Sequence, residues 1–176
     1  MTLLSSFSPK SSLKTLTIIS FLLTSLLGVL FHFVYEWSGN QPLLGLFFPV
    51  NESVWEHLKL IFFPLLLVSC LEYFIGNSPK SDFVCIKLRS ALLGMLTVVI
   101  LFYTYIGILG TVIDWLNIVL YFVAVAIAYL YSYRKFCSDT ILTCNQNLSL
   151  LLIFSITILF MVFTIYPPNL GIFQAP

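Results

Sequence analysis

Residues 91–109 read ALLGMLTVVILFYTYIGIL and contain no charged side chain. A helix needs about 20 mostly apolar residues to cross the hydrocarbon core of a bilayer. The stretch does not alternate between apolar and polar residues as a barrel strand does, and an open sheet in lipid would leave its edge groups without hydrogen bonds. We therefore predict a transmembrane helix here, and an all-α fold.

Four further stretches share this apolar character, and they lie near residues 16–35, 54–75, 112–131 and 148–166. The whole chain is 60% hydrophobic and 9% charged, against about 45–50% and about 25% in soluble domains. A soluble chain this short cannot bury so much apolar surface. The sequence predicts a polytopic membrane helix bundle of five transmembrane helices, a single transmembrane domain over residues 1–176, with the lipid bilayer as its main partner.

The positions of the lysine and arginine residues predict the orientation of the bundle. All of them except Lys59 precede the first span or lie in the connections before the third and fifth spans: Lys10, Lys14, Lys80, Lys87, Arg89, Arg134 and Lys135. Cationic connections favour the cytoplasmic side. The N-terminus is therefore predicted inside and the C-terminus outside.

The first span has no small-residue cleavage site after it, so we expect it to be retained rather than removed as a signal peptide.

Charge and cysteine content exclude some partners and sites. The net charge is +1, which argues against a nucleic-acid partner, because phosphate binding needs clustered cations. The four cysteines, Cys70, Cys85, Cys137 and Cys144, form no CxxC pair. The last three fall on or near the predicted cytoplasmic side, where thiols stay reduced. We expect all four to be unpaired, incidental residues.

Ionisable residues gather where the first two spans reach the predicted outer surface. His32 and Glu36 are four residues apart, and so are Glu52 and Glu56, with His57 next. Residues at this spacing share one helix face, and the short connection makes the two helix ends neighbours. The candidate polar cluster comprises His32, Glu36, Glu52, Glu56, His57, Lys59 and Asp114. Such groups at membrane depth are costly and usually functional.

A divalent metal such as zinc is the sharpest interpretation of this cluster. Zinc binds imidazole nitrogen and carboxylate oxygen, and a catalytic zinc has three protein ligands and one open position. His32 and His57 would supply two ligands, and Glu36, Glu52 or Glu56 the third, leaving another Glu as general base. No HExxH motif supports this. The same residues could instead form a proton relay, with Lys59 offsetting the charge of Glu56.

Structural roles explain the same residues without a site. Ser53 and Glu56 fit a capping box, and Asp114 fits an acid that stabilises a helix N-terminus. His32 fits a histidine packed between helices. Glu72 fits an ion pair with Lys80, Lys87 or Arg89, or a side chain that extends to the membrane interface. Gly28 and Ser25 fit close helix packing.

The apolar segment 40–51 is too short to span, and either enters the bilayer and covers the cluster or lies at the interface.

Residues 30–40, LFHFVYEWSGN, and 48–59, FPVNESVWEHLK, together with Tyr166-Pro167-Pro168 and the tail at 171–173, resemble a family of small bacterial integral membrane proteins known only as a numbered domain of unknown function. The resemblance covers nearly the whole chain. It implies a protein of the bacterial cytoplasmic membrane and carries no known activity.

The sequence leaves the function open between several classes, and it does not decide whether the protein is an enzyme. We favour an extracytoplasmic metal- or ligand-binding membrane protein. The alternatives are a membrane-embedded metal-dependent hydrolase, a small proton-linked transporter or channel, and a non-catalytic partner or sensor module. A transporter with five helices would be expected to form a homo-oligomer, because five helices are few for alternating access.

Overall fold

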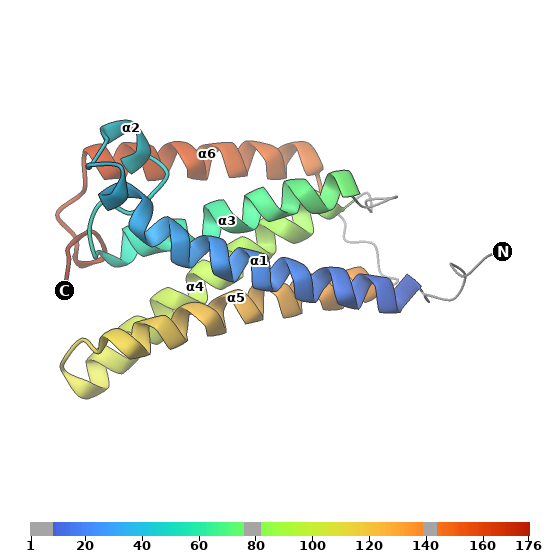
Figure 1. Ribbon diagram of the computed structural model, residues 1–176, viewed down its shortest axis with the longest axis horizontal. Helices are drawn as coiled ribbons and strands as arrows, with labels where there is room; N and C mark the ends of the chain where they lie inside the picture. The colour runs from blue at the N-terminus through green and yellow to red at the C-terminus, as the bar shows by residue number, and fades with distance from the viewer. Residues whose placement is uncertain (1–8, 76–81, 139–143) are drawn as a thin grey trace.

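Five long helices run side by side along the length of the molecule (Figure 1). The computed structural model describes residues 9–75, 82–138 and 144–176. The elements are α1 (Pro9–Trp37), α2 (Pro42–Gly45), α3 (Val54–Ile75), α4 (Phe83–Leu109), α5 (Asp114–Cys137), α6 (Gln146–Ile165) and the 3-10 helix η1 (Gly171–Phe173). All of them except α2 and η1 are long and apolar enough to cross a membrane. The predicted all-α fold with five spans is confirmed.

The ends of the helices differ from the predicted spans where charges lie inside a helix. Helix α3 has the predicted bounds, but α4 begins at Phe83, eight residues before the predicted start at residue 91. The charges of Lys87 and Arg89 led us to predict a connection before residue 91 instead of a helix. Lys87 is instead buried and forms an ion pair with Glu72 of α3, so its charge is compensated inside the bundle. Lys80 lies outside the described residues.

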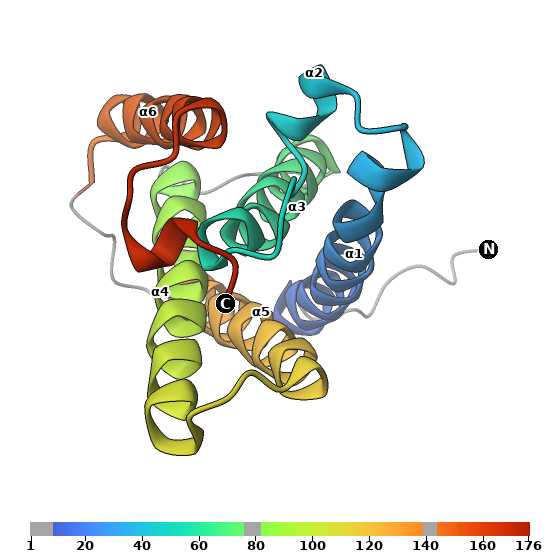
Figure 2. The ribbon, with the colours of Figure 1, turned by 90° about the vertical axis from the view of Figure 1, so that its left-hand side faces the viewer.

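Helix α3 is the centre of the bundle, and the other long helices surround it (Figure 2). Within the membrane-spanning part of α3, 67% of the residues are buried, against 11–28% in the other four helices. Ile61, Phe62 and Leu65 form the core of the packing, with Ala124 and Ala128 of α5. A helix that is apolar on all faces is expected at this position.

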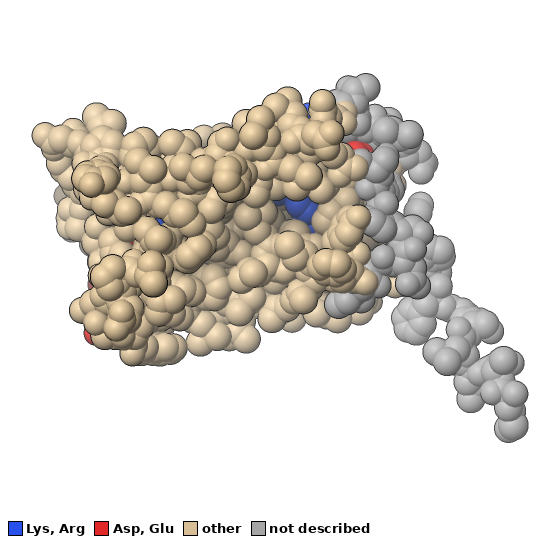
Figure 3. Space-filling model, turned by 90° about the horizontal axis from the view of Figure 1, so that it is seen from above, with Lys and Arg blue, Asp and Glu red and all other residues tan. Residues whose placement is uncertain are grey.

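The outer surface of the bundle is apolar and suited to lipid. The face in Figure 3 is almost entirely free of charged side chains, apart from a few blue and red atoms. Large side chains such as Leu22, Phe74 and Phe154 are more than half exposed. In water this surface would cause association. With the five apolar helices, it identifies the chain as an integral membrane protein.

Helix α1 approaches α3 and α5 closely at Gly28. A Cβ atom at this position would lie 2.7 Å from the Leu60 carbonyl oxygen and would overlap the Tyr121 hydroxyl. Pro64 lacks an N–H group, so the Leu60 carbonyl cannot receive its usual helical hydrogen bond. The Tyr121 hydroxyl lies 3.1 Å from the backbone oxygen of Thr24. The predicted close contact at Gly28 is confirmed.

A buried ion pair lies at the C-terminal end of α3. Glu72 and Lys87 are in contact, and both side chains are less than 10% exposed. The Lys87 ammonium lies 5.1 Å from the centre of the Tyr129 ring, and the Tyr129 hydroxyl bonds the Thr24 hydroxyl at 2.6 Å. The prediction that Glu72 pairs with one of three nearby cations is confirmed, and Lys87 is the partner.

The prediction that all four cysteines are unpaired is wrong for Cys85 and Cys144, which form a disulfide. Packing of α6 on α4 brings their Cα atoms to 6.5 Å, a distance that a disulfide spans. The two residues are 59 apart in sequence, so no local motif could indicate the pair. Cys70 and Cys137 are free.

The orientation and the disulfide together give a redox prediction. The charge pattern predicts that Cys85 lies at the cytoplasmic face, where thiols are held reduced, so we expect the disulfide to form only when the protein is exposed to air. Mass spectrometry after alkylation in denaturant should therefore count four free thiols in acid-trapped cells and two in air-oxidised protein. A Cys85→Ser variant should show three in both samples. Only two free thiols in acid-trapped cells would contradict the predicted orientation.

Candidate functional site

The site is built where α1 ends and the chain turns towards α3. Helix α1 ends at Trp37 because Gly39 and Asn40 adopt positive φ angles of 71° and 61°, which glycine and asparagine tolerate best. The Asn40 N–H group donates to the Tyr35 carbonyl at 3.1 Å. Pro42 then opens α2, as proline favours the first turn of a helix.

Helix α3 begins with a side-chain cap that fixes the position of Glu52. The Ser53 N–H group donates to Asn51 Oδ1 at 2.9 Å, and the Glu56 N–H group donates to Ser53 Oγ at 3.3 Å. The predicted capping box is therefore half formed, because the Glu56 carboxylate turns elsewhere. Glu52 is left directly before the first turn of α3, next to the end of α1.

His32, Glu52 and His57 converge at this end of the bundle. His57 Nε2 lies 3.3 Å from one Glu52 oxygen, and His32 Nε2 lies 3.8 Å from the other. One ligand atom from each of the three residues lies within 4.8 Å of the others. The histidine side chains are about one-third exposed and that of Glu52 is 66% exposed, so the group is open to solutes.

The hydrogen bond at the back of the His57 ring decides which nitrogen faces Glu52. His57 Nδ1 lies 2.9 Å from the Ser53 carbonyl oxygen, and a carbonyl only accepts, so Nδ1 carries the hydrogen. In the neutral ring Nε2 is then a bare lone pair aimed at a carboxylate. Two acceptors at this distance repel each other unless a proton or a metal cation lies between them.

The ring of His32 lacks a comparable support. Its Nδ1 atom is buried and has no hydrogen-bond partner among the described residues. Buried polar atoms nearly always have one. The ring lies beside that of His57, tilted by 32° and with centroids 5.4 Å apart. A ligand bound at Nε2 would supply the missing constraint on its orientation.

The charge of Glu52 is stabilised by its surroundings. Contact with the His57 side chain holds the pKa of Glu52 below its usual range, and partial burial opposes this effect. A positive charge on either imidazole would act in the same direction as the contact. Glu52 is therefore ionised at neutral pH, which is the state in which a carboxylate binds a metal.

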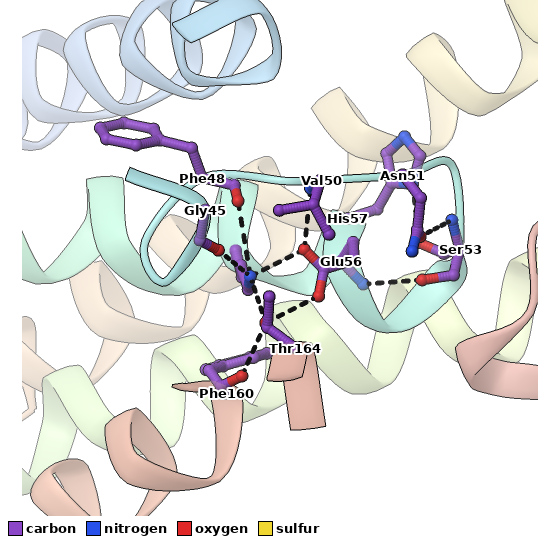
Figure 4. A network of polar contacts seen from close by, with 10 residues as sticks. Gly45, Phe48, Val50, Asn51, Ser53, Glu56, His57, Phe160 and Thr164 are labelled. Atoms are coloured by element: carbon purple, nitrogen blue, oxygen red, sulfur yellow. Dashed lines mark hydrogen bonds and ion pairs between the residues drawn. The ribbon is translucent and has the colours of Figure 1, made fainter. Parts of the chain in front are cut away.

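Glu56 and Lys59 belong to a second, separate network. Lys59 is fully buried and donates to Glu56 Oε2 at 2.7 Å, to the Gly45 carbonyl at 2.8 Å and to the Thr164 hydroxyl at 2.6 Å. The second Glu56 oxygen lies 2.9 Å from the Thr164 hydroxyl. Figure 4 shows the carboxylate enclosed between the loop and α6. The predicted compensation of Glu56 by Lys59 is present in the structure.

The segment 40–51 covers this network. Phe47 packs against Phe63 at 5.5 Å and Phe48 against Phe31 at 4.6 Å, measured between ring centroids. The ammonium group of Lys59 donates hydrogen bonds to backbone carbonyls of the segment. The Val50 N–H group donates to the Glu56 carboxylate at 3.0 Å. The segment therefore shields Glu56 and Lys59.

The remaining predicted site residues lie apart from the three converging side chains. Glu36 is exposed at the end of α1, and it contributes no atom to the group of His32, Glu52 and His57. Glu56 is held by Lys59. Of the predicted ligands, the structure brings together His32, His57 and Glu52, and it leaves Glu36 and Glu56 outside. Asp114 is exposed at the start of α5 and lines a cavity that Glu52 and His57 also line.

This cavity has a volume of about 310 Å³ and lies between α3, α4 and α5. Its polar lining includes Glu52, His57, Asp114 and Asn117, and its apolar lining includes Leu60, Val98, Phe102 and Leu120. The apolar residues could not be identified from the sequence, because they look like any lipid-facing or core residue. The same holds for Thr164 in the buried network.

Comparisons with known proteins give a family and no activity. Residues 6–176 match the sequence model of a protein family, which is described as "Family of unknown function (DUF6512)". No curated protein and no solved structure matches the chain. The resemblance to an uncharacterised family is confirmed, and the site has to be interpreted from its own geometry.

Proposed function

Since the chain belongs to that family of unknown function, we propose from the geometry alone that it is a metal-binding membrane protein. His32, His57 and Glu52 bind one divalent ion, and zinc is the metal that their chemistry favours. Two imidazoles and one carboxylate with a free fourth position are a known ligand set for catalytic zinc. By the predicted orientation the ion lies at the extracytoplasmic face, in a bacterial cytoplasmic membrane.

The observation that carries this proposal is the pair of imidazole nitrogens facing one carboxylate. Zinc ligands lie about 2.0–2.2 Å from the metal, so in a tetrahedral site two ligand atoms are about 3.4 Å apart. The ligand atoms here lie within 4.8 Å of one another. Side-chain shifts of about 0.7 Å on each side would close them around one ion. The hydrogen bond from His57 Nδ1 to Ser53 is the outer-shell contact that such ligands usually have.

The elemental content of the purified protein tests the proposal. Wild-type protein purified without chelator and dialysed should contain about one zinc per chain, since three side-chain ligands suffice for a site of this kind. His57→Ala and Glu52→Gln should each lose most of it. Metal content should also fall in acid, because protons compete for the imidazole ligands.

Glu36→Gln is the matched control, because Glu36 lies one turn from His32 and outside the proposed ligand set. It should keep the metal. Wild-type protein that stays metal-free after incubation with zinc would overturn the proposal. The carboxylate would then share a proton with His57 instead of a metal ion.

A further inference from the structure

The cavity beside the proposed metal site changes character with depth. Its outer lining contains Glu52 and Asp114, which lie at the starts of α3 and α5, beside the apolar residues Val54, Val112 and Pro176. On α5 the lining continues through Asn117 to Leu120 and Tyr121. Seven residues of helix, from Asp114 to Tyr121, correspond to about 10 Å. The charged side chains of the cavity therefore lie at the outer surface, and its inner end is mainly apolar.

The inner end is formed by side chains of three membrane-spanning helices. Leu60 comes from α3, Val98 and Phe102 from α4, and Leu120 from α5. Apart from the Tyr121 hydroxyl, which already bonds the backbone of α1, such a lining has no hydrogen-bonding groups to offer a sugar, a peptide or a free ion. A hydrocarbon chain fits it, and the surrounding bilayer supplies such chains.

We propose that the cavity binds one acyl chain of a phospholipid, with the phosphate of that lipid at the metal ion held by His32, Glu52 and His57. This inference rests on the proposed function. The two share Glu52 and His57, which line the cavity and belong to the metal site. A lipid in this position would thus occupy the open coordination position with a phosphate oxygen.

The size and charge of the cavity select this ligand. A volume of about 310 Å³ is at the lower end of small-molecule sites, about 300–1,000 Å³, so it takes one chain and not a whole two-chain lipid. Glu52 and Asp114 place two carboxylates at the mouth. They would repel an anionic headgroup unless a metal cation compensates them, and Asp114 is left to accept a hydrogen bond from an ammonium group.

Binding of a single-chain phosphoethanolamine lipid with a photoreactive group at the chain end tests the inference. Zinc-loaded protein in a detergent without alkyl chains is titrated with this probe, and the crosslinked residues are identified by mass spectrometry. Crosslinks should fall on the inner lining, at Val98, Leu120 or Tyr121. Removal of zinc, or removal of the phosphate from the probe, should weaken binding at least about ten-fold, since metal and phosphate act together.

Leu120→Trp is the variant that separates this inference from the proposed function. The indole would fill the inner end of the cavity, and Leu120 is not a metal ligand, so crosslinking should fall about ten-fold or more while the zinc content stays unchanged. Ile118→Trp is the matched control, because Ile118 lies on the same helix and is 58% exposed. It should change neither readout, and retained zinc shows that each variant is folded.

Three outcomes would overturn the inference. Zinc-loaded wild-type protein without crosslinks to the inner lining would overturn it and leave the proposed function intact. Equal binding of the probe with and without its phosphate would show that the chain alone is recognised. Inorganic phosphate that binds the zinc-loaded protein as tightly as the lipid would show that the acyl chain contributes nothing.

Discussion

Lys59→Met should destabilise the protein by about 3–5 kcal/mol, the usual cost of breaking a buried ion pair by removing one partner. Lys59 is fully buried, and its ammonium bonds Glu56, Thr164 and the carbonyl of Gly45. Methionine fills a similar volume but donates no hydrogen bond. The Glu56 carboxylate would remain inside the bundle with its charge uncompensated.

Unfolding in detergent by titration with a denaturing surfactant, followed by circular dichroism, measures this loss. Lys14→Met is the control, because Lys14 is exposed on α1 and should change stability by less than about 0.5 kcal/mol. The double variant Lys59→Met with Glu56→Leu should be more stable than Lys59→Met alone, because no charge is left buried. A single variant as stable as the wild type would show that Glu56 and Lys59 are not a buried pair.

Gly28→Ala should displace α1 and weaken metal binding by at least about ten-fold, the scale seen when support around metal ligands is lost. The new methyl group would overlap the Tyr121 hydroxyl and approach the Leu60 carbonyl. Neither neighbour moves freely. The Leu60 carbonyl is part of the backbone of α3, and the Tyr121 hydroxyl bonds the backbone of α1. His32 lies one turn further along α1, so displacement of the helix moves this ligand away from His57.

Zinc titration and surfactant unfolding of the same variant measure the two effects together. We expect a loss of about 1–3 kcal/mol in stability from overpacking. Gly107→Ala is the matched control, since a Cβ there meets nothing within 4 Å and alanine favours a helix over glycine. Unchanged zinc affinity in Gly28→Ala would mean that the position of α1 is not set at this contact.

The spans could be predicted because lipid imposes a simple rule on sequence. An uncharged apolar run long enough to cross a bilayer is a local property, and so is the cation pattern between runs. The predicted start of α4 was wrong for an equally clear reason, because Lys87 is compensated by Glu72 of another helix. A charge paired across helices looks in the sequence like a charge in a loop.

The candidate site was predicted in part. Its histidines and glutamates were found because the ends of α1 and α3 had to be neighbours. Which glutamate faces the histidines could not be predicted, because Glu52 and Glu56 differ by only one turn. The cap at Ser53 and the burial of Lys59 decide between them. The disulfide of Cys85 and the cavity depend on contacts between distant segments, which leave no local pattern.

The two ion pairs of α3 also limit how the bundle can move. Glu56 is tied to α6 through Thr164 near one end of the helix, and Glu72 is tied to α4 through Lys87 near the other. Sliding α3 by a single turn, about 5.4 Å, would break both attachments at once. Helix α3 therefore cannot slide along its own axis. Any motion that links the two faces of the membrane has to come from the helices around it.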